Sequence, residues 1–62
     1  MEPILNNYLV KMEKYLKALP AAERIDIVNE LKSEMIELSD KGISGEQIVN
    51  RLGNPKVLAR AY

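Results

Sequence analysis

The chain has 62 residues, and its nine Lys or Arg balance nine Asp or Glu, so its formal net charge is zero. This length predicts one domain, 1–62, and the balanced charge argues against nonspecific nucleic-acid binding, which needs a surplus of cations. The absence of Cys and His excludes a disulfide and argues against zinc. No apolar run is long enough to cross a membrane, and we expect neither insertion of this segment nor a signal peptide.

A first helix is expected from Pro3 to Ala18, because Pro suits the first helical position. Apolar residues recur at three- and four-residue steps, which is typical of one buried helical stripe: Ile4, Leu5, Tyr8, Leu9, Met12, Tyr15, Leu16 and Leu19. We expect Tyr8 and Tyr15 to pack in the core with their hydroxyls at its rim. Val10 lies off the stripe and should be exposed.

A second helix should open at Pro20 and reach Lys41, since Pro20 disfavours helical geometry in Leu19. Its expected core line is Ile25, Val28, Leu31, Met35 and Leu38, widened on its edges by Ile27 and Ile36. So wide a stripe indicates contact with more than one neighbour. The opposite face carries the acidic residues Glu23, Asp26, Glu30, Glu34 and Glu37.

The acidic face has two interpretations besides simple solvation. Carboxylates at this spacing share metal ions in helical bundles, but those sites point inward and also use His. Docking to a basic surface would relieve repulsion between neighbouring carboxylates. The net charge is +1 over residues 1–20, −3 over 21–41 and +2 over 42–62, which suits a self-complementary bundle. We favour a solvated face without metal.

Residues 42–55 contain several residues that typically end or begin helices. Gly42 should end the second helix in a left-handed conformation. Ser44 and Gln47 form a capping box for a third helix, and Ile43 and Ile48 occupy the two ends of a hydrophobic staple. The third helix should bury Ile48, Val49 and Leu52 and end at Gly53. Asn54 should cap a fourth helix that begins at Pro55. The residues of this fourth helix that are expected to face inward are Val57, Leu58, Ala61 and Tyr62.

These elements predict an all-α fold, an antiparallel helical hairpin with a short two-helix corner packed against it. Catalysis is not expected, because Ser33, Ser39 and Ser44 have no His to activate them and no Lys sits in an apolar run. The glycines are isolated turn residues, so we expect no phosphate loop. We therefore predict no catalytic residue, no cofactor site and no metal site.

One alternative interpretation is a small helix-turn-helix-like DNA-binding domain that uses the helix at 55–62. Its turn at Leu52-Gly53 is shorter than usual for that motif. The helix would present mainly Lys56, Ala59 and Arg60 outward, whereas base reading usually takes Arg, Asn or Gln at several positions.

The order of the turn and cap residues also resembles a known family, the HAAS domain of bacteria. The matching residues are Leu16, Leu19-Pro20, Glu23-Arg24, Glu30, Gly42, Ser44, Glu46-Gln47-Ile48, and Leu52-Gly53-Asn54-Pro55-Lys56 with Ala59. The family often has Asp where this chain has Asn54, and both residues cap helices well. The similarity extends over most of the chain.

The resemblance implies a non-catalytic interaction or signalling module. In that family the domain is typically cytosolic and N-terminal to transmembrane helices, similar modules precede permeases, and the genes often neighbour PadR-type regulators. We accordingly expect a cytoplasmic domain, tethered to the membrane in a longer parent protein, that binds protein: a second copy, as a homodimer, or the parent's membrane part. The residues expected to form the interaction surface are Ile27, Ile36, Leu38, Val57, Leu58 and Tyr62.

Overall fold

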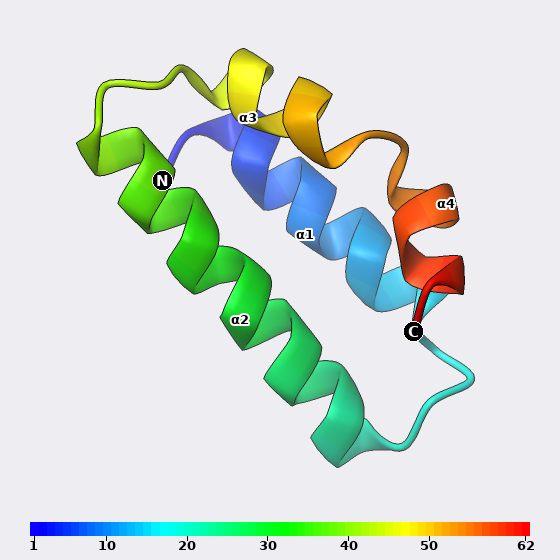
Figure 1. The fold of residues 1–62 in the computed structure, drawn as a ribbon. Coiled ribbons are helices and arrows are strands. Elements are labelled where there is room, and N and C mark those ends of the chain that lie inside the picture. The colour runs from blue at the N-terminus through cyan, green and yellow to red at the C-terminus, as the bar shows by residue number, and fades with distance from the viewer.

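The computed structural model describes residues 1–62 and contains four helices and no strand (Figure 1). They are α1 (Pro3–Tyr15), α2 (Ala21–Asp40), α3 (Gly45–Leu52) and α4 (Pro55–Arg60). The hairpin of α1 and α2 is packed against the α3–α4 corner, and α1 contacts all three other helices. The predicted all-α fold is confirmed.

The first turn differs from the prediction. α1 ends at Tyr15 rather than Ala18, and the Leu19 N–H donates to the Leu16 carbonyl at 2.9 Å in a tight turn. Pro20 is the N-cap of α2 and not its first helical residue, because its ψ of 149° is extended. Its carbonyl still accepts the first bond of α2, from the Arg24 N–H at 3.1 Å.

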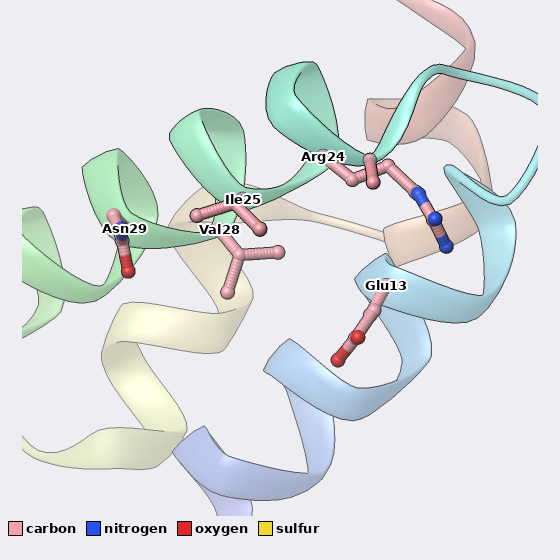
Figure 2. A pocket seen from close by; sticks show the side chains of 6 residues that line it. Glu13, Arg24, Ile25, Val28 and Asn29 are labelled. Atoms are coloured by element: carbon pink, nitrogen blue, oxygen red, sulfur yellow. The ribbon is translucent and has the colours of Figure 1, made fainter.

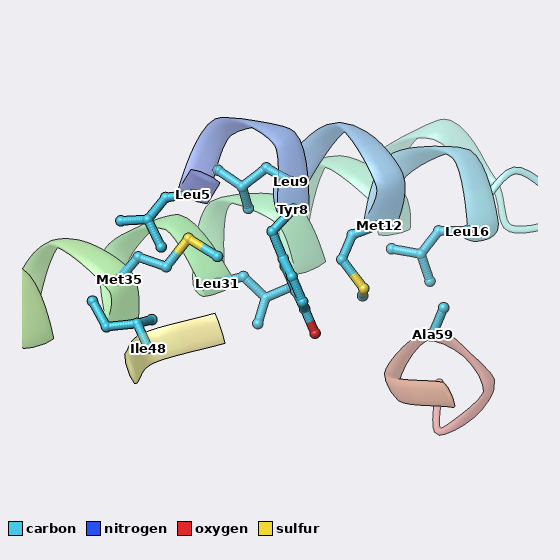
Figure 3. Close-up of a cluster of buried hydrophobic side chains, with 9 residues drawn as sticks. All are labelled: Leu5, Tyr8, Leu9, Met12, Leu16, Leu31, Met35, Ile48 and Ala59. Atoms are coloured by element: carbon cyan, nitrogen blue, oxygen red, sulfur yellow. The ribbon is translucent and has the colours of Figure 1, made fainter. Parts of the chain in front are cut away.

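The core belongs mainly to α1 and the residue that follows it. Its buried side chains are Leu5, Tyr8, Leu9, Met12, Leu16, Leu31, Met35, Ile48 and Ala59 (Figure 3). The longer α2 supplies only Leu31 and Met35, and each helix of the corner supplies one residue. Full burial of such a side chain stabilises the fold by about 1.5–3 kcal/mol. The central position of α1 explains why its stripe is the best buried.

Several expected core positions lie at the surface. Ile25 is 58% exposed, and the other exposed members of the expected stripes are Ile4, Tyr15, Ile36, Val57, Ala61 and Tyr62. At 3.6 residues per turn, Ile25 lies about 100° round the helix from the direction of Leu31 and Met35, so it cannot share their contacts. The remaining expected core residues are half-buried against the core: Leu19, Ile27, Val28, Leu38, Ile43, Val49, Leu52 and Leu58.

The end of α2 is a Schellman turn. Gly42 has φ +86°, its N–H donates to the Ser39 carbonyl at 3.0 Å, and the Ile43 N–H donates to the Leu38 carbonyl at 3.2 Å. Leu38 and Ile43 are both half-buried against the core, which fits the apolar contact that accompanies this motif. The turn directs the chain back toward α1.

The start of α3 is the predicted capping box. The Gln47 N–H donates to the Ser44 hydroxyl at 3.2 Å, and the Ser44 N–H donates to Gln47 Oε1 at 3.4 Å. Gly45, the first residue of α3, is buried. A Cβ there would collide with the Glu2 carboxylate and would lie 2.6 Å from Ile4 Cγ2. Gly45 thus permits α3 to approach the start of α1, a role that the sequence did not reveal.

The turn between α3 and α4 depends on a more unusual glycine. Gly53 has φ +81° and ψ −164°, a combination that is extended in ψ and essentially restricted to glycine. This geometry differs from the left-handed helical conformation that glycine usually adopts at the end of a helix. Asn54 then caps α4, with its Oδ1 accepting from the Lys56 N–H at 2.9 Å, and Pro55 is the first helical residue.

Candidate interaction surface

One face of the α1–α2 hairpin is covered by the corner. A pocket on this side is lined from α1 by Ile4, Asn7, Tyr8 and Lys11, from α3 by Val49 and from α4 by Pro55. Ala59 of α4 is buried in the core, whereas the helix-turn-helix alternative would present it outward. Its small side chain allows α4 to lie close to α1. We call this side of the hairpin the covered face.

The covered face holds one unusual polar group, the Tyr8 hydroxyl. Tyr8 is 3% exposed, and its hydroxyl is buried without a hydrogen-bond partner. The expectation that this hydroxyl reaches the rim is wrong, because the corner closes over it on the side where Ile48 and Ala59 lie (Figure 3). Burial raises the pKa of Tyr8 above its ordinary value, and the charge of the Tyr62 phenolate raises it further.

The opposite side of the hairpin has no cover. Two pockets open along it, and both are lined only by the hairpin and by Met1 at its start. The first, near the α1–α2 turn, is lined by Glu13, Ala21, Arg24, Ile25, Val28 and Asn29 (Figure 2). The second, near the chain start, is lined by Met1, Leu5, Asn6, Lys32, Met35, Ile36, Ser39 and Asp40. We call these two pockets together the open groove, with a turn end and a start end.

Apolar side chains follow the open groove along one flank of α2. Ile25 is 58% exposed and Ile36 is 47% exposed, with the half-buried Val28 between them. Ile25, Val28, Lys32 and Ile36 succeed one another at steps of three and four residues, the spacing of a helix-packing seam. Lys32 is the one charged member of this seam.

Charged side chains in the open groove have no ion partner within the chain. The only ion pair is Lys41 Nζ to Glu37 Oε1 at 3.5 Å, on the exposed surface of α2. The turn end carries Glu13 and Arg24, and the start end carries Lys32 and Asp40. The Arg24 Nε is buried without a hydrogen-bond partner. Each end of the groove thus carries one acid and one base that have no ion partner in the chain.

The six residues predicted as an interaction surface do not form one patch. Ile36 lies in the start end of the open groove. Val57, at 63% exposure, and Tyr62 lie on or after α4, which packs on α1. The other three, Ile27, Leu38 and Leu58, are half-buried against the core. Among the six, Ile36 alone lines the open groove.

The predicted surface did not include Ile25, Val28 and Lys32, because the apolar periodicity of α2 assigned the first two to the core. The signal was present in the spacing of Ile25, Lys32 and Ile36, which places them on one flank of α2. What was lacking is the direction of the core. The position of α1 fixes that direction, and residue spacing within α2 does not report it.

The other sites considered from the sequence are all at the surface. The acidic residues of α2 are exposed and do not combine into a group of three that could hold a metal ion. On α4, Lys56 and Arg60 are exposed. No helix combines the length and apolar character that crossing a membrane requires.

Comparison with known proteins gives one match. Neither the curated proteins nor the solved structures contain a significant match to this chain. The family model HAAS matches residues 7–61, which include all of α2, α3 and α4 and most of α1. Because that match spans nearly the whole chain, the protein belongs to the HAAS family.

Proposed function

We propose that this domain is a non-catalytic protein-interaction module that binds its partner through the open groove. The observation that carries the proposal is the uncovered flank of α2, where Ile25 and Ile36 are exposed beside charges that have no partner. Exposed apolar residues scattered singly are ordinary, but a seam at helix-packing spacing is typical of an interface.

Composition supports the non-catalytic part of this proposal. The chain has neither His nor Cys, and the Ser44 hydroxyl accepts the Gln47 N–H as a cap. The HAAS resemblance supports a cytoplasmic module attached to a membrane protein, with the membrane part or a second copy as partner. The proposed partner is therefore a protein, and we propose neither a nucleic-acid ligand nor a cofactor.

Site-specific photocrosslinking in the cells that naturally make the protein tests this function. A photoreactive residue replaces Asn29, which lines the turn end of the open groove, and in a matched control it replaces the exposed Asn50 of α3. We expect a protein adduct from position 29 and none from position 50. Equal labelling at both positions, or no adduct from either, would contradict an interaction through the groove.

A further inference from the structure

We infer that the protein segment that binds the open groove comes from outside this domain and is acidic where it reaches the turn end. This inference rests on the proposed function, because it gives the charge of the partner of the same surface. The observation that carries it is a third pocket beside the turn end, lined by Val10, Glu13, Lys14, Lys17 and Arg24. We call this third pocket the basic pocket.

The basic pocket adjoins the turn end of the open groove, since Glu13 and Arg24 line both. Lys14 comes from the last turn of α1, Lys17 follows that helix, and Arg24 lies near the start of α2. The Arg24 side chain extends from α2 toward the end of α1 (Figure 2). A segment bound at the turn end therefore has three cationic side chains beside it.

The charges of the basic pocket are not balanced within the chain. Its ionisable residues are three bases and one acid, which gives this surface a net charge of +2. None of them forms an ion pair, because the only pair in the chain joins Lys41 to Glu37. The Arg24 Nε also lacks a hydrogen-bond partner. Carboxylates of a partner would balance this surplus, and the planar guanidinium group suits them.

The mixed lining of this region favours a protein segment over a chain of phosphates. A phosphate backbone would bring negative charge against Glu13 and leave the apolar Ile25 and Val28 without a matching group. An amphipathic segment can place acidic side chains at Lys14 and Lys17 and apolar side chains at Ile25 and Val28. The acidic segment is therefore the occupant that fits both pockets at once.

The same charges argue against a second copy of this chain at the turn end. A two-fold contact centred on the basic pocket would place Lys14 and Lys17 near the same residues of the other copy. Like charges in contact oppose association. The acidic face of α2 does not relieve this repulsion, since none of its residues lines the basic pocket or the open groove.

Mapping the adduct from position 29 tests the charge of the partner. Asn29 and Arg24 both line the turn end, so a photoreactive residue at position 29 labels a segment beside the basic pocket. We expect mass spectrometry to find a labelled segment with a net charge of about −2 or lower over roughly seven residues on either side. A neutral or basic segment, or a second copy of this chain, overturns the inference, whereas the protein-interaction function stands. The absence of any adduct overturns both.

Charge reversal gives a matched test in the same cells. Lys14→Glu combined with Lys17→Glu should lower the yield of the position-29 adduct by about tenfold or more, because the reversed charges repel an acidic segment. The control combines Arg51→Glu with Lys56→Glu, which reverses two exposed charges on the corner. It changes the net charge equally and should alter the yield by less than about twofold, since distant surface charges are screened.

Equal losses in the two double variants overturn the inference, as does an unchanged yield in Lys14→Glu with Lys17→Glu. Far-ultraviolet circular dichroism of each purified variant verifies that it is folded. All four substituted residues are exposed, so we expect both double variants to keep the helical content of the wild type.

Discussion

The two faces of the α1–α2 hairpin differ in whether another helix of the chain covers them. On the covered face, Ile48 and Ala59 of the corner close over α1 and are buried. On the open face, Ile25 and Ile36 project from α2 with no helix of the chain against them. The difference shows that the corner stabilises the domain from one side only. It leaves the second flank of the longer helix uncovered.

The largest contrast is expected from truncating one isoleucine on each face. Ile48→Ala should cost about 2–5 kcal/mol, because it leaves a cavity in a fully buried site. Ile25→Ala should change the stability of the dilute monomer by no more than about 0.5 kcal/mol, since its side chain is mostly in solvent. Urea unfolding followed by circular dichroism measures both. Equal costs would contradict the distinction between the two faces.

Gly53→Ala tests how firmly the turn holds the corner over the hairpin. Its backbone geometry is restricted to glycine, so the substitution should destabilise by about 1–3 kcal/mol. A Cβ at this position meets no atom within 4 Å, and the cost is therefore purely conformational. Gly42→Ala, which also has open space and a positive φ, is the matched comparison and should cost less, since the left-handed helical region is accessible to alanine at about 1–2 kcal/mol.

Tyr8→Phe probes the single buried polar group of the covered face. Removing an unpartnered buried hydroxyl should stabilise the domain by about 1 kcal/mol, because the cost of its desolvation disappears. The midpoint of thermal unfolding should rise. A lower midpoint would indicate that the hydroxyl has a hydrogen-bond partner in solution.

The raised pKa of Tyr8 also predicts a pH dependence. The unfolded chain loses this proton at about pH 10, whereas the folded chain holds it to higher pH. Ionisation of Tyr8 therefore leaves stability unchanged below about pH 10 and lowers it as the pH rises through the folded-state pKa. Unfolding of the wild type between about pH 9 and 12 should be steeper in pH than that of Tyr8→Phe.

The smallest effect is expected on the outer side of the corner. Replacing the exposed Lys56 and Arg60 with Ala should change stability by less than about 0.5 kcal/mol. Fluorescence anisotropy with duplex DNA completes the test of the helix-turn-helix alternative. Specific, salt-sensitive binding that the double variant abolishes would favour that alternative over a structural corner.

Local signals in the sequence predict the helices and most turns of this protein well. Ser44, Gln47, Asn54 and Pro55 act through neighbours within three residues, so their roles can be inferred without a structure. Gly53 was predicted to end α3, but its ψ depends on the direction that the chain takes into α4. The role of Gly45 depends on Glu2 and Ile4, which are distant in sequence.

The candidate surface was harder to predict for a related reason. The width of the apolar stripe on α2 correctly indicates more than one neighbour, yet it does not say which edge stays uncovered. Ile27 and Leu38 are half-buried against the core, whereas Ile25 is at the surface. Which flank faces solvent follows from the side on which the corner packs. That choice is tertiary and leaves no periodic signal within α2.

The most direct test of the two faces is the effect of a soluble paramagnetic agent on the methyl NMR signals of the isolated chain. We expect strong broadening at Ile25 and Ile36, which are exposed on the open face, and little broadening at Ile48, which is buried under the corner. Equal broadening at all three positions, or broadening at Ile48 alone, would contradict the distinction between the two faces.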